Sequence, residues 1–136
     1  MRLFGSNGIR GIAHDELPVE MVRDLGLALG STLSRHATVC VGNDARGSTA
    51  EFREALADGL RRSGIDVVLL GRLPTPALAG TTALRGYDAG VMITASHNPP
   101  EYNGIKLFNP DGSSFDAAQR DQITEAIVSD SFTTAL

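Results

Sequence analysis

The chain has 136 residues, 42% of them hydrophobic and 21% charged, a balance typical of one globular domain of ordinary size. A formal net charge of -4 argues against binding to nucleic acid or to a membrane surface, because either partner calls for a basic stripe. The single cysteine, Cys40, excludes an internal disulfide framework, and no run approaches the roughly 20 apolar residues of a membrane span, so we expect a cytoplasmic protein.

Helical periodicity alternates with short apolar runs along the whole chain. The predicted elements, in chain order, are a helix within residues 17–35, a strand at 38–43, a helix at 48–64, a strand at 65–71, a helix at 75–84, strands at 88–95 and 105–108, and a helix that begins at 116. This order predicts an α/β fold, in which ligands bind on the loops after the carboxyl ends of the strands. Cys40, in the first strand, is predicted to pack in the core.

Three helix starts carry local capping signals. Ser48 and Glu51 have the S-x-x-E spacing of a capping box, and Asp116 with Gln119 has the related D-x-x-Q spacing. Thr75 is predicted to cap the short third helix, since a proline follows it at the first helical position.

The segment "GNDARGST", residues 42–49, has the spacing of a phosphate-binding P-loop between a strand and a helix. Ser48 stands where the P-loop lysine would be, so the loop lacks the charge that reaches the outer phosphates. One interpretation is a degenerate nucleotide loop. The other is a simple turn in which Asp44 pairs with Arg46, and Arg46 could still help to bind an anion.

The segment "FGSNGIRG", residues 4–11, repeats glycine at every third position, which is not the dinucleotide-binding pattern. Dense glycines let the backbone approach a ligand closely. Arg10 offers a planar fork for phosphate or carboxylate. The segment could also be a bare turn.

The stretch "TASHNPPEYNGIK", residues 94–106, brings several reactive groups together after a buried strand. Ser96 lies beside His97 and Asn98 in a loop stiffened by two prolines, and Lys106 follows on the next strand. A fixed hydroxyl beside a positive charge suits phosphoryl transfer, which needs positioning and charge neutralisation. The G-x-S-x-G elbow of serine hydrolases is absent, and a simple Asx-rich turn is the remaining alternative.

These three segments together resemble the α-D-phosphohexomutases, a family that includes phosphoglucomutase, phosphomannomutase and phosphoglucosamine mutase. "TASHNPPEYNGIK" is similar to their phosphoserine loop, "FGSNGIRG" to FGTSGIRG, and "VGNDARGS" to VGRDxRxS. The resemblance covers essentially residues 1–136 as the first of four domains. It implies a three-layer α/β/α domain with a mixed sheet of about four strands, the last antiparallel.

The resemblance also implies roles for particular residues. Ser96 would be the phosphorylated serine, attended by Lys106, Arg10 and His97. The candidate substrate- and phosphate-binding residues are Asn98, Ser6, Asn7 and Arg46. Two departures stand out: Ser6 and Asn7 replace Thr-Ser, and Asn43 replaces an arginine, which removes one positive charge.

The implied reaction interconverts hexose 1-phosphate and hexose 6-phosphate through a hexose bisphosphate. Mg²⁺ would be held by the Ser96 phosphate and by a D-G-D-x-D motif of the second domain, which this sequence lacks. The later domains would therefore be necessary partners, and we expect the chain alone to be inactive. The alternatives are a stand-alone phosphosugar-binding or regulatory module and a degenerate P-loop nucleotide binder.

Overall fold

The computed structural model describes residues 4, 5, 8–95 and 98–132. Helices and strands alternate through most of this length, as the sequence periodicity predicts. In chain order the elements are β1 (Ile9–Ile12), α1 (Val19–Ser31), β2 (Thr38–Asn43), α2 (Thr49–Arg62), β3 (Asp66–Arg72), α3 (Thr75–Arg85), β4 (Ala89–Ile93), β5 (Tyr102–Phe108) and α4 (Ala117–Ser129).

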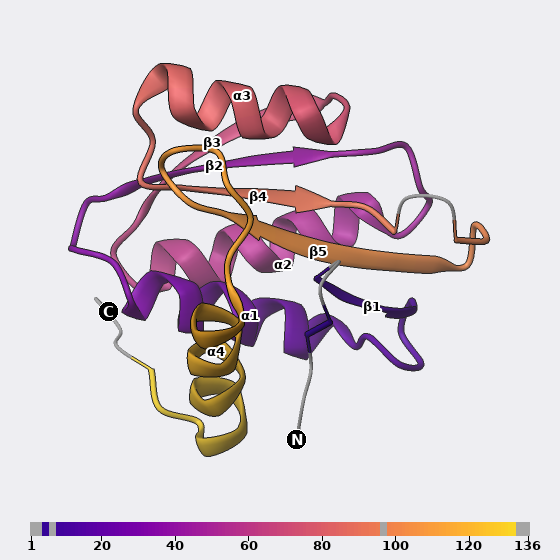
Figure 1. Ribbon diagram of the computed structural model, residues 1–136. Coiled ribbons are helices and arrows are strands. Elements are labelled where there is room, and N and C mark those ends of the chain that lie inside the picture. Colours follow the sequence, from indigo (N-terminus) through magenta and orange to yellow (C-terminus); the bar gives the residue numbers. More distant parts are fainter. Residues whose placement is uncertain (1–3, 6–7, 96–97, 133–136) are drawn as a thin grey trace.

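The strands form one mixed sheet in the order β1-β5-β4-β2-β3 (Figure 1). Strand β2 runs parallel to β3 and β4, whereas β5 is antiparallel to both β4 and β1. The predicted mixed sheet with an antiparallel last strand is confirmed. It has one strand more than expected, because Ile9–Ile12 pairs with β5 as an edge strand that its own short sequence does not reveal.

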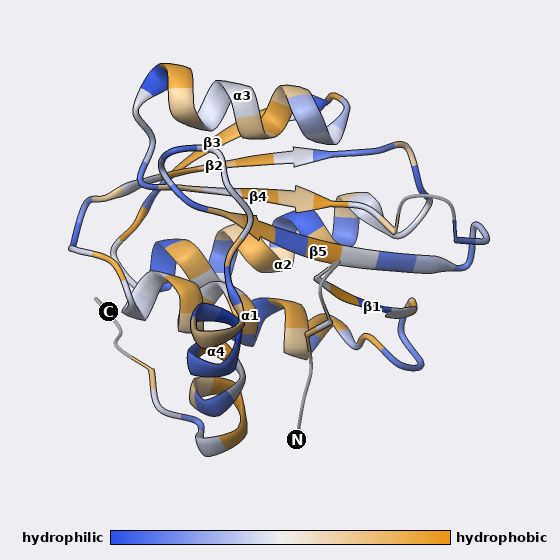
Figure 2. Ribbon diagram, in the orientation of Figure 1, coloured by the Kyte–Doolittle hydropathy of each residue, from blue (hydrophilic) through white to orange (hydrophobic). Residues whose placement is uncertain are grey.

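Helices cover the sheet on both faces and make three layers. Helix α3 packs on β2 and β4 from one side, while α1 and α2 pack together on the other side and α4 packs on α1 (Figure 1). Figure 2 shows α1 and α2 alternating between hydrophobic and hydrophilic residues, as expected of helices with one buried face. Cys40 is fully buried under α3 beside Leu78 and Met92, so the prediction that it packs in the core is confirmed.

The predicted capping box of Ser48 and Glu51 is wrong. Ser48 does precede α2, but its side chain makes no capping hydrogen bond, and its hydroxyl accepts instead from Asn103 Nδ2 at 2.8 Å. The Glu51 carboxylate hydrogen-bonds His14 Nε2 at 2.8 Å. Partners from distant parts of the chain have replaced the local ones.

Of the other two predicted caps, the Asp116–Gln119 capping box is confirmed and the Thr75 cap is wrong. Asp116 and Gln119 form both hydrogen bonds of a capping box at the start of α4. Helix α3 begins at Thr75 itself, one residue earlier than predicted, with Pro74 in the cap position. Gly64 follows α2 with a φ of +84°, the left-handed conformation that glycine adopts most easily. Within the described residues, no helix is both long and apolar enough to cross a membrane.

Candidate active site at the Ser96 loop

The candidate site lies at the edge of the sheet where β2 and β4 end, since parallel strands bring their carboxyl ends together. Residues 94–101, here called the Ser96 loop, connect β4 to β5 at this edge (Figure 1). Ser96 and His97 lie outside the described residues, as do Ser6 and Asn7, so their predicted roles stay predictions. The described ends of the loop show how it is held.

Asp44 anchors the beginning of the Ser96 loop to the turn after β2. Its carboxylate accepts hydrogen bonds from Thr94 Oγ1 at 2.8 Å, Thr49 Oγ1 at 3.2 Å and the Arg46 amide at 3.1 Å. Burial on its own would raise the pKa of Asp44, but these bonds and the Arg46 guanidinium hold it below its usual value. The Asp44 carboxylate thus already accepts from the Arg46 amide and the Thr49 hydroxyl, two donors that a nucleotide phosphate would need in a P-loop, which disfavours the nucleotide-binding interpretation.

The Asp44→Asn variant is expected to be about 2 kcal/mol less stable than the wild type at pH 7, because charge-assisted hydrogen bonds are lost. The lowered pKa means that ionised Asp44 stabilises the fold above its unfolded pKa near 3.8, and that this stabilisation is lost as the pH falls through the lower folded value. Urea denaturation at pH 7 and pH 3 measures the difference. A stability gap between the two proteins that is as large at pH 3 as at pH 7 would contradict this assignment.

Arg46 holds the end of the Ser96 loop. Its Nε donates to Asp44 Oδ2 at 3.0 Å, which confirms the local pairing predicted from the sequence. Its Nη1 donates to the carbonyl oxygens of Pro99 at 2.7 Å and Tyr102 at 3.0 Å, and its Nη2 donates to that of Asn98 at 3.0 Å. The Arg46 side chain is only 12% exposed, so most of its surface contacts other residues of the protein and not solvent.

The predicted phosphate ligand Asn98 lies beside a hollow at this edge. An open space of about 390 Å³ is bordered by the turn after β2 and by the second half of the Ser96 loop. Its lining residues are Asp44, Ala45, Arg46, Gly47, Asn98 and Pro100. The volume falls in the range of small-molecule sites.

Arg10 lies on β1, opposite Gly104 of β5. A Cβ atom at Gly104 would stand 2.7 Å from Arg10 Cγ and 2.9 Å from the Thr94 carbonyl oxygen. The Arg10 side chain therefore lies over the glycine, close to where the Ser96 loop begins. Its Nε is buried and has no hydrogen-bond partner among the described residues. A buried guanidinium N–H in that state suits an anion.

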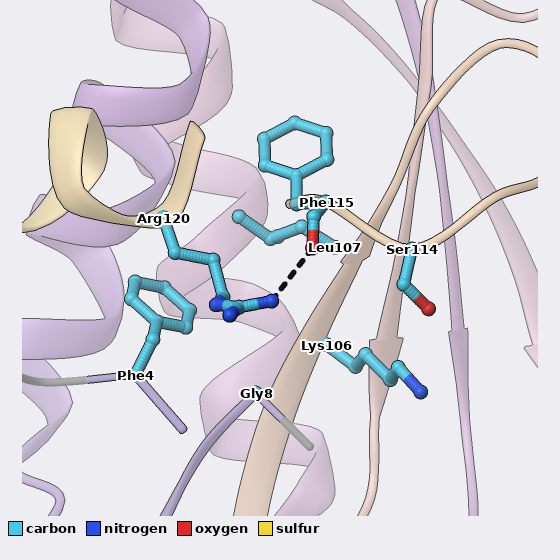
Figure 3. Close-up of a pocket in the computed structure, with 7 residues that line it drawn as sticks. All are labelled: Phe4, Gly8, Lys106, Leu107, Ser114, Phe115 and Arg120. Atoms are coloured by element: carbon cyan, nitrogen blue, oxygen red, sulfur yellow. Dashed lines mark hydrogen bonds between the residues drawn. The ribbon is translucent and has the colours of Figure 1, made fainter. Parts of the chain in front are cut away.

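Lys106 is on β5 as predicted, two residues beyond Gly104 and on the same face of the sheet. Its Nζ lies 5.6 Å from the centre of the Phe108 ring, a cation–π distance, which turns the amine away from the Ser96 loop. In Figure 3 the Lys106 side chain also extends away from Arg120, which donates to the Phe115 carbonyl oxygen at 2.8 Å. The hollow in that view, at about 10 Å³, has room for about one water.

Asn103 is a residue of this region that the sequence did not single out. It is fully buried, and its Nδ2 donates to Ser48 Oγ and Thr49 Oγ1 at 2.8 and 3.3 Å. Its Oδ1 accepts from the Gly104 amide at 2.9 Å. Asn103 thereby ties the start of β5 to the start of α2. No sequence signal marks it, because the two hydroxyls that accept from its Nδ2 lie more than 50 residues away.

The described side chains do not by themselves fit a bound Mg²⁺. Magnesium prefers an octahedral shell of oxygen ligands, and no three His, Cys, Asp or Glu side chains gather at metal-binding distance in the described part of the chain. Asp44, the carboxylate that accepts from Thr94 at the start of the loop, is already occupied by four donors.

Known proteins resemble the chain over nearly all of its length. Residues 1–134 match the family described as "Phosphoglucomutase/phosphomannomutase, alpha/beta/alpha domain I". The chain is 49% identical over 132 residues to a Methanosarcina acetivorans protein named "Probable phosphoglucosamine mutase". The matched stretch covers 97% of this chain and 29% of that protein. It is 42% identical over 135 residues to the "Phosphoglucomutase/phosphomannomutase" of Thermococcus kodakarensis, covering 96% and 30% of the two chains.

A solved structure agrees with these sequence matches. A phosphoglucomutase/phosphomannomutase family protein of Burkholderia thailandensis superposes with a TM-score of 0.83 at 36% identity, covering 97% of this chain and 31% of that one. The chain thus spans less than a third of the length of the proteins it matches.

Proposed function

Because the chain belongs to the phosphoglucomutase/phosphomannomutase family, as its alpha/beta/alpha domain I, we propose that it supplies the phosphoserine loop of a phosphohexomutase. A protein in which this domain is joined to the later domains of the family, here called the joined protein, interconverts a hexose 1-phosphate and a hexose 6-phosphate through a hexose bisphosphate. The observation that carries the proposal is the buried Arg10 Nε, which has no partner among the described residues and lies where the Ser96 loop begins. The phosphate of a phosphoserine is a suitable partner for it.

In the proposed reaction the bond between phosphorus and Ser96 Oγ breaks as an oxygen of the hexose phosphate bonds to phosphorus. A base takes the proton of that sugar hydroxyl, and the departing Ser96 Oγ gains a proton. The bisphosphate then turns over, and Ser96 Oγ loses its proton as it bonds to the other phosphoryl group. The bond between that group and its sugar oxygen breaks, and the sugar oxygen gains a proton. Arg10 contributes positive charge to the transferred group. Lys106 can do the same only when its amine turns from the Phe108 ring toward the Ser96 loop. His97, Asn98, Ser6 and Asn7 remain proposed contacts.

Mg²⁺ is proposed as the cofactor of the joined protein. A phosphoserine carries about -1.5 to -2 charges at pH 7, so a divalent cation helps it to meet an anionic sugar phosphate. Since the described side chains do not fit a metal site, the carboxylate ligands must come from a domain outside this chain. The chain would contribute only the Ser96 phosphate.

A chimera tests the proposed function. In it, the aligned 132-residue stretch of this chain replaces its counterpart in the Methanosarcina acetivorans relative. With Mg²⁺ and a hexose bisphosphate, we expect the chimera to convert at least one of glucosamine, glucose and mannose 1-phosphate to the 6-phosphate. The 136-residue chain should give no conversion above the blank, because it carries only one wall of the site.

The unmodified relative serves as the positive control, and circular dichroism establishes that both proteins are folded. A folded chimera that converts none of the three sugars, beside an active control, would refute the phosphohexomutase proposal. Robust conversion by the 136-residue chain would refute the need for further domains. Tight binding of a hexose phosphate by that chain alone, measured by calorimetry, would favour the stand-alone binding module.

A further inference from the structure

The Ser96 loop is held at both ends by one pair of side chains. Asp44 accepts from Thr94 Oγ1 at the beginning of the loop, and Arg46 donates to the carbonyl oxygens of Asn98, Pro99 and Tyr102 at its end. Asp44 and Arg46 are joined to each other through Arg46 Nε. We infer that Asp44 and Arg46 form a brace that fixes the two described ends of the Ser96 loop, and that Arg46 is a positioning residue and not a ligand of the substrate phosphate. The first half of this inference concerns the fold alone, and the second rests on the proposed function.

The geometry favours a brace because the acceptors of Arg46 are backbone carbonyls on a short, tight segment. The Asn98 amide donates to the Ala95 carbonyl oxygen at 3.0 Å, and the Tyr102 amide donates to that of Pro99 at 2.9 Å. Neither hydrogen bond belongs to the β ladder. A planar guanidinium can satisfy several outward-pointing carbonyls at once, which a lysine ammonium cannot do with the same geometry.

The brace is partly shielded from water and fixed to rigid structure. The side chains of Arg46 and Asp44 are 12% and 27% exposed, so their hydrogen bonds are less weakened by solvent than those of a surface ion pair. Thr49 Oγ1, in the first turn of α2, donates to Asp44 Oδ1 at 3.2 Å. The pair is therefore built on the junction of β2 and α2, beneath the loop it supports.

The consequence for the reaction follows from the demands of phosphoryl transfer. Catalysis of this transfer depends on positioning and charge, and a displacement of about 1 Å can cost about 10²-fold in rate. Loss of the brace should therefore lower kcat about 10²-fold and leave KM within about 3-fold, because a positioning residue does not bind the sugar. Loss of a phosphate ligand would instead raise KM.

Two measurements test the inference with Arg46→Ala, Arg46→Lys and the matched control Arg85→Ala, which removes an exposed arginine from the last turn of α3. The first is hydrogen exchange in the 136-residue chain. The amides of Asn98 and Tyr102 should exchange at least about 10-fold faster in Arg46→Ala, and less so in Arg46→Lys, while amides of the central strands β2 and β4 and those of the control stay unchanged. The second is the separation of kcat from KM in the chimera.

Unchanged exchange at Asn98 and Tyr102 in Arg46→Ala would overturn the brace. A KM that rises about 10-fold or more with unchanged kcat would return Arg46 to the role of phosphate ligand. If Arg46→Ala does not fold, Arg46→Lys carries both measurements, since it keeps the charge and loses the fork. A chimera without any activity would reject the proposed function, whereas the exchange rates would still decide whether the brace exists.

Discussion

Ser96→Ala in the chimera is expected to abolish hexose phosphate interconversion, with kcat falling by at least about 10³-fold. The reason is chemical: alanine has no oxygen to accept the phosphoryl group, and neighbouring cations cannot replace a missing acceptor. The brace and Arg10 would remain in place, so the folded state should be preserved. Conversion of glucosamine, glucose and mannose 1-phosphate is measured together with intact protein mass.

The mass measurement makes this prediction specific to phosphoserine. The wild-type chimera should carry one phosphoryl group, located by fragmentation on the peptide that contains Ser96, and Ser96→Ala should carry none there. Ser34→Ala removes an exposed hydroxyl just before β2, away from the Ser96 loop, and should keep both activity and phosphate. Wild-type turnover in Ser96→Ala would remove this serine from the mechanism.

Gly59→Ala is expected to cost about 3 kcal/mol of the free energy of unfolding, because α1 and α2 cross with their backbones in contact. A Cβ atom at Gly59 would lie 2.2 Å from the Arg23 carbonyl oxygen and 2.9 Å from the Leu27 amide nitrogen, both backbone atoms of α1. Backbone atoms inside a helix cannot turn aside, so the helices must separate. The same crossing is tight from the other side, since a Cβ at Gly26 would lie 2.5 Å from the Leu56 carbonyl oxygen.

Urea denaturation of the 136-residue chain measures this loss, and Gly80→Ala is its matched control. Gly80 is also a helical glycine, but no heavy atom lies within 4 Å of its added Cβ. Alanine is the better helix former, so this control should gain about 0.5 to 1 kcal/mol. Equal effects of the two substitutions would show that helix propensity, and not the contact between α1 and α2, dominates at Gly59.

The sequence by itself determined those features whose interacting groups lie within a few residues of each other. The alternation of helices and buried strands, the capping box of Asp116 and Gln119, and the pairing of Asp44 with Arg46 were all predicted and are present. The α/β class follows from the same periodicity, and the three-layer α/β/α arrangement was implied by the resemblance carried by residues 4–11, 41–48 and 94–106. Each of these patterns either repeats along the chain or involves residues close together in sequence, so it can be recognised without knowledge of the fold.

Only the tertiary structure decided how groups far apart in the chain use their hydrogen bonds. Ile9–Ile12 forms a strand because it pairs with the edge of β5. Ser48 does not cap α2 with its side chain, because its hydroxyl accepts a hydrogen bond from buried Asn103. The sequence suggested the Arg46 guanidinium as part of an anion site. In the structure it donates hydrogen bonds to carbonyl oxygens of a loop more than 50 residues away. The physical reason is that a buried polar group must be satisfied by whichever partner the fold brings to it, and sequence spacing cannot identify that partner.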